Sequence, residues 1–331
     1  MNALQTLLRR REVSILLVAV ILLAVTTAVN PRFLFSLDGW RNLWVNPAIL
    51  FVLAIGEAFV IISKHVDLSV GSVMGLTAFS LGMLHTLWPT LPVPLAFVIG
   101  IAIGATLGFV NGSLVAVAKV PGMVITLGTM YAYRGIDVVW AGSRRINASE
   151  LNPDLLSLGV AAIPGVRIPI ITVIALVVVA LAAWYLSSTR SGREFYAIGS
   201  APEAAVLYGL PTGRRMLAAF TISGACAGMA GVLFVARYGT IASNAGTGYE
   251  LQAIGAAVIG GIAIVGGSGT AVGAAFGAFL LATINSALPI LGVQDFWQKA
   301  VLGALILGAI ILDRVLAHRR ARRAHAERLL S

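Results

Sequence analysis

The chain has 331 residues, of which 59% are hydrophobic and only 11% are charged. Soluble domains carry about 25% charged residues, so this composition excludes an ordinary soluble enzyme or binding domain. The net charge of +10 does not indicate nucleic acid as a partner, because the basic residues stand at the ends of apolar segments. A single cysteine, Cys226, and four scattered histidines predict neither a disulfide framework nor a bound metal.

Repeated apolar runs reach the roughly 20 residues that a helix needs to cross a bilayer. They predict an all-α polytopic membrane protein with about ten transmembrane helices. The predicted spans are 13–29, 46–62, 69–87, 93–118, 123–140, 168–187, 216–236, 250–265, 270–290 and 296–313. The third, fifth and eighth are short or rich in glycine and polar residues. We expect these three to be the ones that are broken or re-entrant, if any are.

Lysine and arginine are concentrated at alternate ends of the predicted spans, which predicts a cytoplasmic N-terminus. An even number of spans then places both termini in the cytoplasm. The predicted division is a cytoplasmic N-terminus at 1–12, a transmembrane domain at 13–313 with a cytoplasmic loop at 188–215, and a basic cytoplasmic tail at 314–331. We expect the tail to act as a topology anchor near anionic lipid.

Glycines recur every four residues in three of the predicted spans. The rows are Gly100, Gly104, Gly108 and Gly112, then Gly224 and Gly228, then Gly269, Gly273 and Gly277. This spacing places the glycines of a row on one helix face, where a neighbouring backbone can approach closely. The rows therefore predict tight helix packing, with a close passage for a transported solute as the alternative.

Polar residues within or beside the spans are functional candidates, because an ionisable group in a bilayer is costly. Glu57 is expected to be a protonated packing residue, a partner of a basic group or a pathway residue. Asp67 is expected to cap the span that starts at 69, or to face the solute. Arg134 and Asp137, at i and i+3, form an ion pair or belong to a polar pathway. The remaining candidates are the amides of Asn111 and Gln252, which either join helices or bind hydroxyl groups.

A polar stretch, "GREFYAIGSAPEAAVLYGLPTGRR" at 192–215, interrupts the apolar runs. Ser200 and Glu203 have the spacing of a capping box, Pro202 suits a first helical turn, and Gly209 suits a helix end. The pattern predicts a helix of about two turns, which is too short to be stable alone. The stretch is either an ordinary loop or a segment that docks in a groove of a partner.

This stretch resembles the cytoplasmic coupling loop in permease subunits of bacterial ATP-binding-cassette (ABC) importers of the ribose, or branched-sugar, group. Three other blocks resemble the same family in the same order: "VDLSVGSVMGL" (66–76), "NGSLVAVAKVPGMVITLGTMYAYRGI" (111–136) and "GTGYELQAIGAAVIGGIAIVGGSGTAVGAAFGAFLL" (246–281). Together they cover nearly the whole chain, and they are most similar to the rhamnose and autoinducer-2 branch. Lys64 and His65 stand where many members carry a glycine pair.

The resemblance implies the transmembrane subunit of an importer for a rhamnose-, ribose- or autoinducer-2-like solute, in the bacterial inner membrane. It also implies a separate ATPase subunit, an extracytoplasmic sugar-binding protein, and a second permease copy or paralogue. Residues 13–313 would be the permease domain, without a cofactor and without enzyme activity, because "VGGSGTAVG" lacks the Lys and Ser/Thr of a P-loop. The coupling residues implied are Gly192, Arg193, Ser200, Pro202, Glu203, Ala204 and Gly209.

Two other functions remain open at the level of sequence. One is a secondary sugar transporter driven by an ion gradient, which would use Glu57 or Asp67, although no inverted repeat of the kind common in such carriers is evident. The other is an ABC permease for branched-chain amino acids. The genomic neighbourhood of the chain would separate these alternatives.

Overall fold

A computed structural model describes residues 11–294, 296–301, 303–305, 307–308 and 311. These residues are helical apart from turns, loops and two isolated β-bridges, Ile146–Ile241 and Ala162–Pro169. The all-α class predicted from composition is therefore confirmed for the described part of the chain. The predicted segment 314–331, and residues 1–10 of the predicted N-terminal segment, lie outside it.

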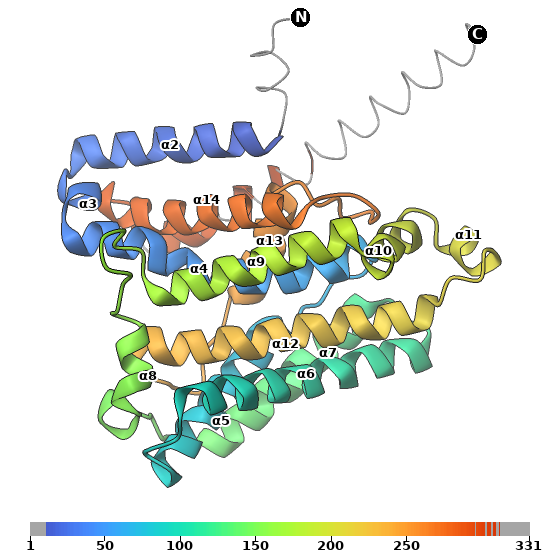
Figure 1. Ribbon diagram of the computed structural model, residues 1–331, viewed down its shortest axis with the longest axis horizontal. Helices are drawn as coiled ribbons and strands as arrows, with labels where there is room; N and C mark the ends of the chain where they lie inside the picture. The colour runs from blue at the N-terminus through green and yellow to red at the C-terminus, as the bar shows by residue number, and fades with distance from the viewer. Residues whose placement is uncertain (1–10, 295, 302, 306, 309–310, 312–331) are drawn as a thin grey trace, which may run out of the picture.

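The helices follow one another as one bundle. They are α2 (Arg11–Val29), α3 (Arg32–Phe35), α4 (Leu37–Ile62), α5 (Val70–Leu87), α6 (Val93–Ala118), α7 (Gly122–Ala141), η1 (Ala148–Glu150), α8 (Pro153–Leu158), α9 (Ile170–Ser188), α10 (Arg190–Ser200), α11 (Pro202–Leu207), α12 (Thr212–Tyr238), α13 (Tyr249–Ile259) and α14 (Ala271–Ile290). The long helices lie roughly side by side, with α3 and α8 at one end and α10 and α11 at the other (Figure 1).

Seven helices of the described part are long and apolar enough to cross a membrane: α2, α4, α5, α6, α9, α12 and α14. Helix α7 has 20 residues but is more polar. The predicted span 250–265 contains only α13, whose 11 residues extend about 16 Å. That length crosses about half of a bilayer core, so this span is broken. The other two candidates for a broken span, 69–87 and 123–140, are the continuous helices α5 and α7. The last predicted span, 296–313, is only partly described.

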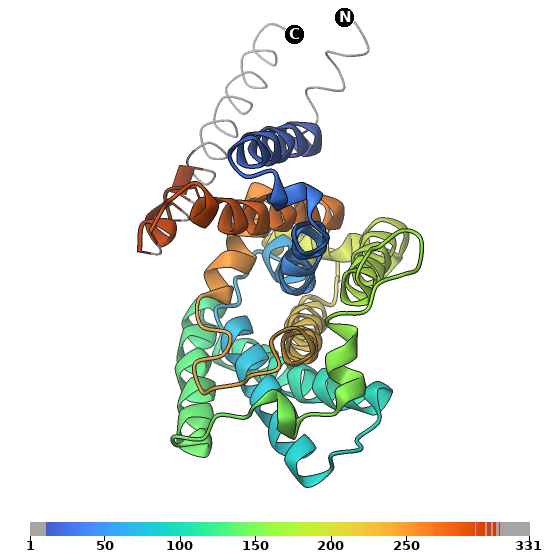
Figure 2. The same cartoon turned by 90° about the vertical axis from the view of Figure 1, so that its left-hand side faces the viewer.

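Two helices form the centre of the bundle. Almost every residue of α4 from Val45 onward is buried, and the apolar face of α12 packs against it. Viewed end-on, α4 and α12 lie between the other helices (Figure 2). Helix α4 begins nine residues earlier than the apolar run indicates, because its first turns carry polar side chains that hydropathy does not detect.

The glycine rows pack helix backbones against each other, as their spacing predicts. A methyl group added at Gly104 would collide with the carbonyl oxygen of Gly224, and one added at Gly228 would collide with that of Gly100. Gly277 approaches Ala256 of α13 in the same way. Gly269, by contrast, lies in a loop before α14, so it does not belong to the helical row.

The turn after α4 explains one departure from the resembled family. Lys64 has a φ of +70°, in the left-handed region that glycine adopts without strain and other residues rarely adopt. The glycine that the resemblance implies at this turn would adopt this conformation without strain. In this chain a lysine takes up the same conformation.

We predict that Gly104→Ala destabilises the protein by about 1–3 kcal/mol, because the added methyl group forces two backbones apart. Thermal unfolding of the detergent-purified protein would measure the effect. The matched control is Gly128→Ala in α7, where no atom lies within 4 Å of the added carbon. An unchanged melting temperature for Gly104→Ala would contradict the close α6–α12 contact.

Candidate functional site

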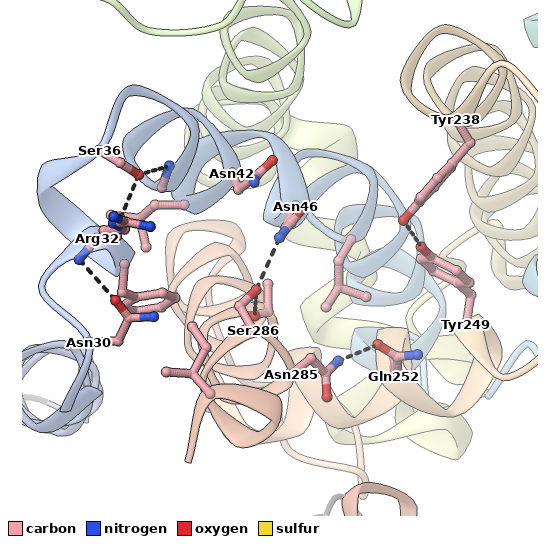
Figure 3. Close-up of a pocket in the computed structure, with 16 residues that line it drawn as sticks. Asn30, Arg32, Ser36, Asn42, Asn46, Tyr238, Tyr249, Gln252, Asn285 and Ser286 are labelled. Carbon is pink, nitrogen blue, oxygen red and sulfur yellow. Dashed lines mark hydrogen bonds between the residues drawn. The ribbon is translucent and has the colours of Figure 1, made fainter. Parts of the chain in front are cut away.

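A polar cavity of about 500 Å³ opens at the end of the bundle that carries α3. Helices α4, α12, α13 and α14 supply most of its walls, and the turn around α3 supplies the rest (Figure 3). Its polar lining consists of amides, hydroxyls and one guanidinium: Asn30, Arg32, Ser36, Asn42, Asn46, Tyr238, Tyr249, Gln252, Asn285 and Ser286. No aspartate or glutamate is among the residues that line it.

Hydrogen bonds between neighbouring helices fix these side chains across the cavity. Asn46 Nδ2 of α4 donates to Ser286 Oγ of α14 at 3.0 Å, and Asn285 Nδ2 donates to Gln252 Oε1 of α13 at 2.9 Å. The hydroxyls of Tyr238 and Tyr249 lie 3.4 Å apart (Figure 3). The cavity wall is therefore ordered before any solute arrives.

Arg237 holds two of the amides from behind the cavity. Its Nη2 donates to Asn42 Oδ1 at 2.9 Å and to Asn46 Oδ1 at 3.2 Å. Because both amide oxygens face the guanidinium, the amide orientation is set by charge as well as by shape. A cavity with many neutral donors and acceptors, and with tyrosine rings beside them, suits a small hydroxylated solute.

Of the predicted candidates, only Gln252 lines this cavity. The other polar lining residues were not predicted, although the sequence carries a signal for them. Asn42 and Asn46 are spaced i and i+4 on one helix face, and Asn285 and Ser286 lie inside an apolar run. Amides in a span are as informative as the ionisable groups that were singled out.

Asp67 and Asn111 belong to a separate buried network around the turn before α5. Asp67 Oδ1 accepts from the backbone N–H and the hydroxyl of Ser69, and Oδ2 accepts from Ser223 Oγ at 3.0 Å. Asn111 Nδ2 donates to Ser69 Oγ at 2.7 Å, and its Oδ1 accepts from Tyr133 Oη at 3.1 Å. These bonds join the turn before α5 to α6, α7 and α12.

This network corrects one prediction and favours one alternative. Ser69, not Asp67, is the N-cap residue of α5, so Asp67 ties a turn to α12 instead of capping the helix. The side-chain amide of Asn111 is bonded at both ends, which favours its role in joining helices.

The predicted ion pair between Arg134 and Asp137 is wrong for this structure. Arg134 donates instead to the backbone carbonyl of Ala245, and neither carboxyl oxygen of Asp137 has a hydrogen-bond partner. Spacing on a helix face allows the pair, but the loop before α13 offers the guanidinium a closer acceptor.

Glu57 is fully buried and its carboxyl oxygens also have no hydrogen-bond partner, so it is not paired with a basic group.

The polar stretch at 192–215, called the coupling stretch below, forms two consecutive helices, α10 and α11, instead of one. Thr189 Oγ1 caps α10 by accepting from the N–H of Gly192 at 2.9 Å, and Arg193 Nη1 donates to Ser188 O at 3.2 Å. Ser200 ends α10 and its hydroxyl contacts Gly267 O, so the predicted capping box with Glu203 is absent. Pro202 begins α11 as predicted, and Gly209 follows it with a φ of +72°.

An ion cluster fixes the base of this stretch to α12. Arg215 Nε lies 2.6 Å from Glu194 Oε2, and Arg190 Nε lies 3.3 Å from Glu194 Oε1. The hydrogen bond from Arg215 lowers the pKa of Glu194. Because Glu194 is largely buried while Arg190 is exposed, the bond to Arg215 is the stronger of the two.

Helix α11 projects from the end of the bundle (Figure 1). Apolar side chains of α11 and of the residue after it are exposed. Leu207 and Tyr208 are 87% and 86% exposed, and Val206 is 62% exposed. Glu203 and Ala204 lie in its first turns, at or near the surface. A tip of this composition is typical of a surface that a protein partner covers.

Comparison with known proteins gives a consistent result. The family described as "Branched-chain amino acid transport system / permease component" matches residues 41–310. The Autoinducer 2 import system permease protein LsrC of Enterobacter sp. (strain 638) is 38% identical over 322 residues, covering 96% of this chain and 92% of the relative. The proteins of that name from Shigella flexneri and Escherichia coli (strain K12 / DH10B) are 37% and 38% identical over 308 residues, covering 92% of this chain and 86% of each relative.

No solved structure matches the chain. The family match spans most of the sequence, and the relatives agree over almost all of it. The seven membrane-capable helices of the described part fit the same assignment. The chain belongs to this permease family and is a multi-pass inner-membrane subunit of an ABC importer.

Proposed function

We propose that this permease imports a small, neutral, hydroxylated solute of the autoinducer-2, rhamnose or ribose type. The observation that carries the proposal is the cavity near α3, whose polar lining is almost entirely amide and hydroxyl. Such groups pair with sugar hydroxyls as both donors and acceptors. The relatives are named as permeases of autoinducer 2 import systems, which supports the same solute class.

A branched-chain amino acid, which the family description names, fits this cavity less well. An amino acid is zwitterionic, and its ammonium group needs a carboxylate or an equivalent set of acceptors when it leaves water. Arg32 could receive the carboxylate, but no acidic residue lines the cavity to receive the ammonium group. The lining therefore favours a neutral solute.

The subunit arrangement we propose follows from the ends of the bundle. The cavity faces outward, toward an extracytoplasmic binding protein, while α10 and α11 face the cytoplasm and dock on a separate ATPase. Two permease chains, identical or paralogous, enclose the pathway. This orientation keeps both termini, 1–12 and 314–331, in the cytoplasm. Between them lies a permease domain of about ten spans at 13–313, which includes the cytoplasmic coupling loop at 188–215. ATP and any other cofactor would then be bound by the partner alone.

Coupling would work as a shift between two states of the permease. Movement of the ATPase pulls α11, and the Glu194–Arg215 bond passes that movement to α12.

The alternative of ion-gradient-driven transport would use Glu57 or Asp67 to bind a cation. Asp67 already accepts hydrogen bonds from Ser69 and Ser223, which disfavours that alternative.

We predict that Gln252→Leu lowers the kcat/KM of solute uptake about tenfold. The change removes the acceptor of Asn285 and one group available to the solute, and hydrogen bonds of this kind contribute about 1 kcal/mol each. Uptake would be measured in proteoliposomes that contain the chain, its ATPase and its binding protein. Asn147→Ala, in an exposed loop away from the cavity, is the control. Equal uptake by wild type and Gln252→Leu would argue against this cavity as the solute site.

We predict that Glu203→Arg reduces ATP-dependent uptake at least tenfold, because it reverses the charge at the start of the exposed helix α11. Glu12→Arg makes the same charge change in the first turn of α2, away from α11, and is expected to leave uptake near the wild-type rate. Membrane insertion is checked for both variants. Uptake by the chain alone under a proton or sodium gradient, unaffected by Glu203→Arg, would overturn the ABC mechanism.

We predict that Glu194→Gln lowers thermal stability at neutral pH but not in acid. The folded-state pKa of Glu194 lies below its unfolded value of about 4.3, so the stabilisation is full above that value and disappears as the pH falls through the folded pKa. The difference in melting temperature between wild type and variant should therefore be constant from pH 7 down to about 5 and should shrink as the pH falls below about 4.3. A difference that stays constant over the whole range would refute the role of the ion pair.

A further inference from the structure

The loop between α12 and α13, residues 240–248, runs back into the bundle instead of staying at its end. The loop first contacts α5 near the outer end of that helix, where the side chain of Ile241 lies against Gly82. Further along, a side chain at Gly75 would meet the carbonyl group of Ala245, and one at Gly71 would meet Gly246 and the carboxylate of Glu250. The loop therefore descends along α5 by about three helical turns.

The lower end of this loop lies near the middle of the membrane. Asp67, just before α5, bonds to Ser223, and Gly231 packs against Met74 and Thr77. The first turn of α5 therefore lies level with the middle of α12, which spans Thr212–Tyr238 and crosses the membrane. Gly246 and the start of α13 lie at that depth, so 240–248 is a non-helical, re-entrant segment.

Polar groups of the re-entrant segment remain uncovered at this depth. The side chains of Asn244 and Thr247 are exposed, and Thr247 Oγ1 donates only to the carbonyl of Asn244 within the same turn. Irregular backbone is tolerated at membrane depth only where protein covers it or where it lines a water-filled space. Lipid is therefore excluded as the neighbour of this face.

Arg134 fixes the segment from α7. Its guanidinium donates to the carbonyl of Ala245, and Gly75 leaves room for both groups on α5. An arginine at this depth needs a strong acceptor or water. The bond to Ala245 gives the loop a fixed position between α5 and α7 and leaves Asn244 and Thr247 on the open side.

We propose that residues 240–248 form a wall of the aqueous solute path at mid-membrane, and that Arg134 is the positioning residue that holds this wall in place. Asn244 and Thr247 face the path, and they offer a side-chain amide and a hydroxyl to a hydroxylated solute. The proposal deepens the proposed function, on which it rests for the nature of the solute. The wall lies on the α5–α7 side of α13, whereas the outer cavity lies on the α4–α14 side.

Cysteine accessibility tests the position of the wall without measuring transport. The chain has a single cysteine, Cys226, and it is buried, so the unsubstituted protein provides the blank. Asn244→Cys and Thr247→Cys would be treated with a charged, membrane-impermeant methanethiosulfonate in sealed right-side-out vesicles. The matched control is Phe109→Cys, which is 51% exposed on the apolar face of α6 beside Gly108.

We expect both wall cysteines to react at least tenfold faster than Phe109→Cys. Arg134→Ala should slow the reaction of Asn244→Cys at least fivefold, and Arg134→Lys, which keeps a charged donor, should slow it about twofold. Arg144→Ala, in an exposed loop, should leave the rate unchanged. If Arg134→Ala does not insert into the membrane, the lysine variant alone decides the role of Arg134, and an unchanged rate would overturn it.

Reaction rates as low as that of Phe109→Cys would overturn the aqueous wall itself. Because labelling requires neither ATP nor the ATPase, such a result leaves the proposed function intact. Conversely, fast labelling combined with no uptake of any sugar-like solute would leave the wall in place and refute the solute class.

Discussion

The contact between α6 and α12 is the constraint on which the rest of the structure depends. Lipid tails are as apolar as leucine, so helices in a bilayer gain little from hiding apolar side chains and depend on close packing instead. Gly100, Gly104 and Gly108 let the α12 backbone come within contact distance at successive turns. With one side of α12 fixed in this way, its other side packs against α4 through Gly56.

The same two central helices carry both ends of the mechanism. On α12, Arg237 orients the amides of the outer cavity, and Arg215 binds Glu194 of the coupling stretch at the opposite end. On α4, Asn42 and Asn46 line the cavity, while the carbonyl of Ile62 accepts from Gly267 beside α10. The proposed solute cavity and the proposed ATPase-docking stretch are thus attached to one pair of helices, which gives a direct physical link between them.

Features that depend on local spacing were predictable from the sequence. The glycine rows indicated close packing, and the short, glycine-rich run at 250–265 indicated a broken span. Features that depend on which acceptor lies nearest in space were not. Arg134 has Asp137 at a favourable helical spacing, yet the fold brings the Ala245 carbonyl closer, and Ser200 is taken up by the end of α10 before it can cap α11. The outer cavity draws its amides from residues more than 200 positions apart, so only the fold assembles it.

The close backbone contact between α6 and α12 also affects where the protein can bend. Side chains in an ordinary interface can change rotamer and let two helices slide, but along Gly104 and Gly108 the contact is backbone against backbone. We therefore expect α6 and α12 to move together as a rigid block. We expect bending instead at the glycine-rich joint at 260–269 and at the turn at Lys64, which meet beside the Gly199 end of α10.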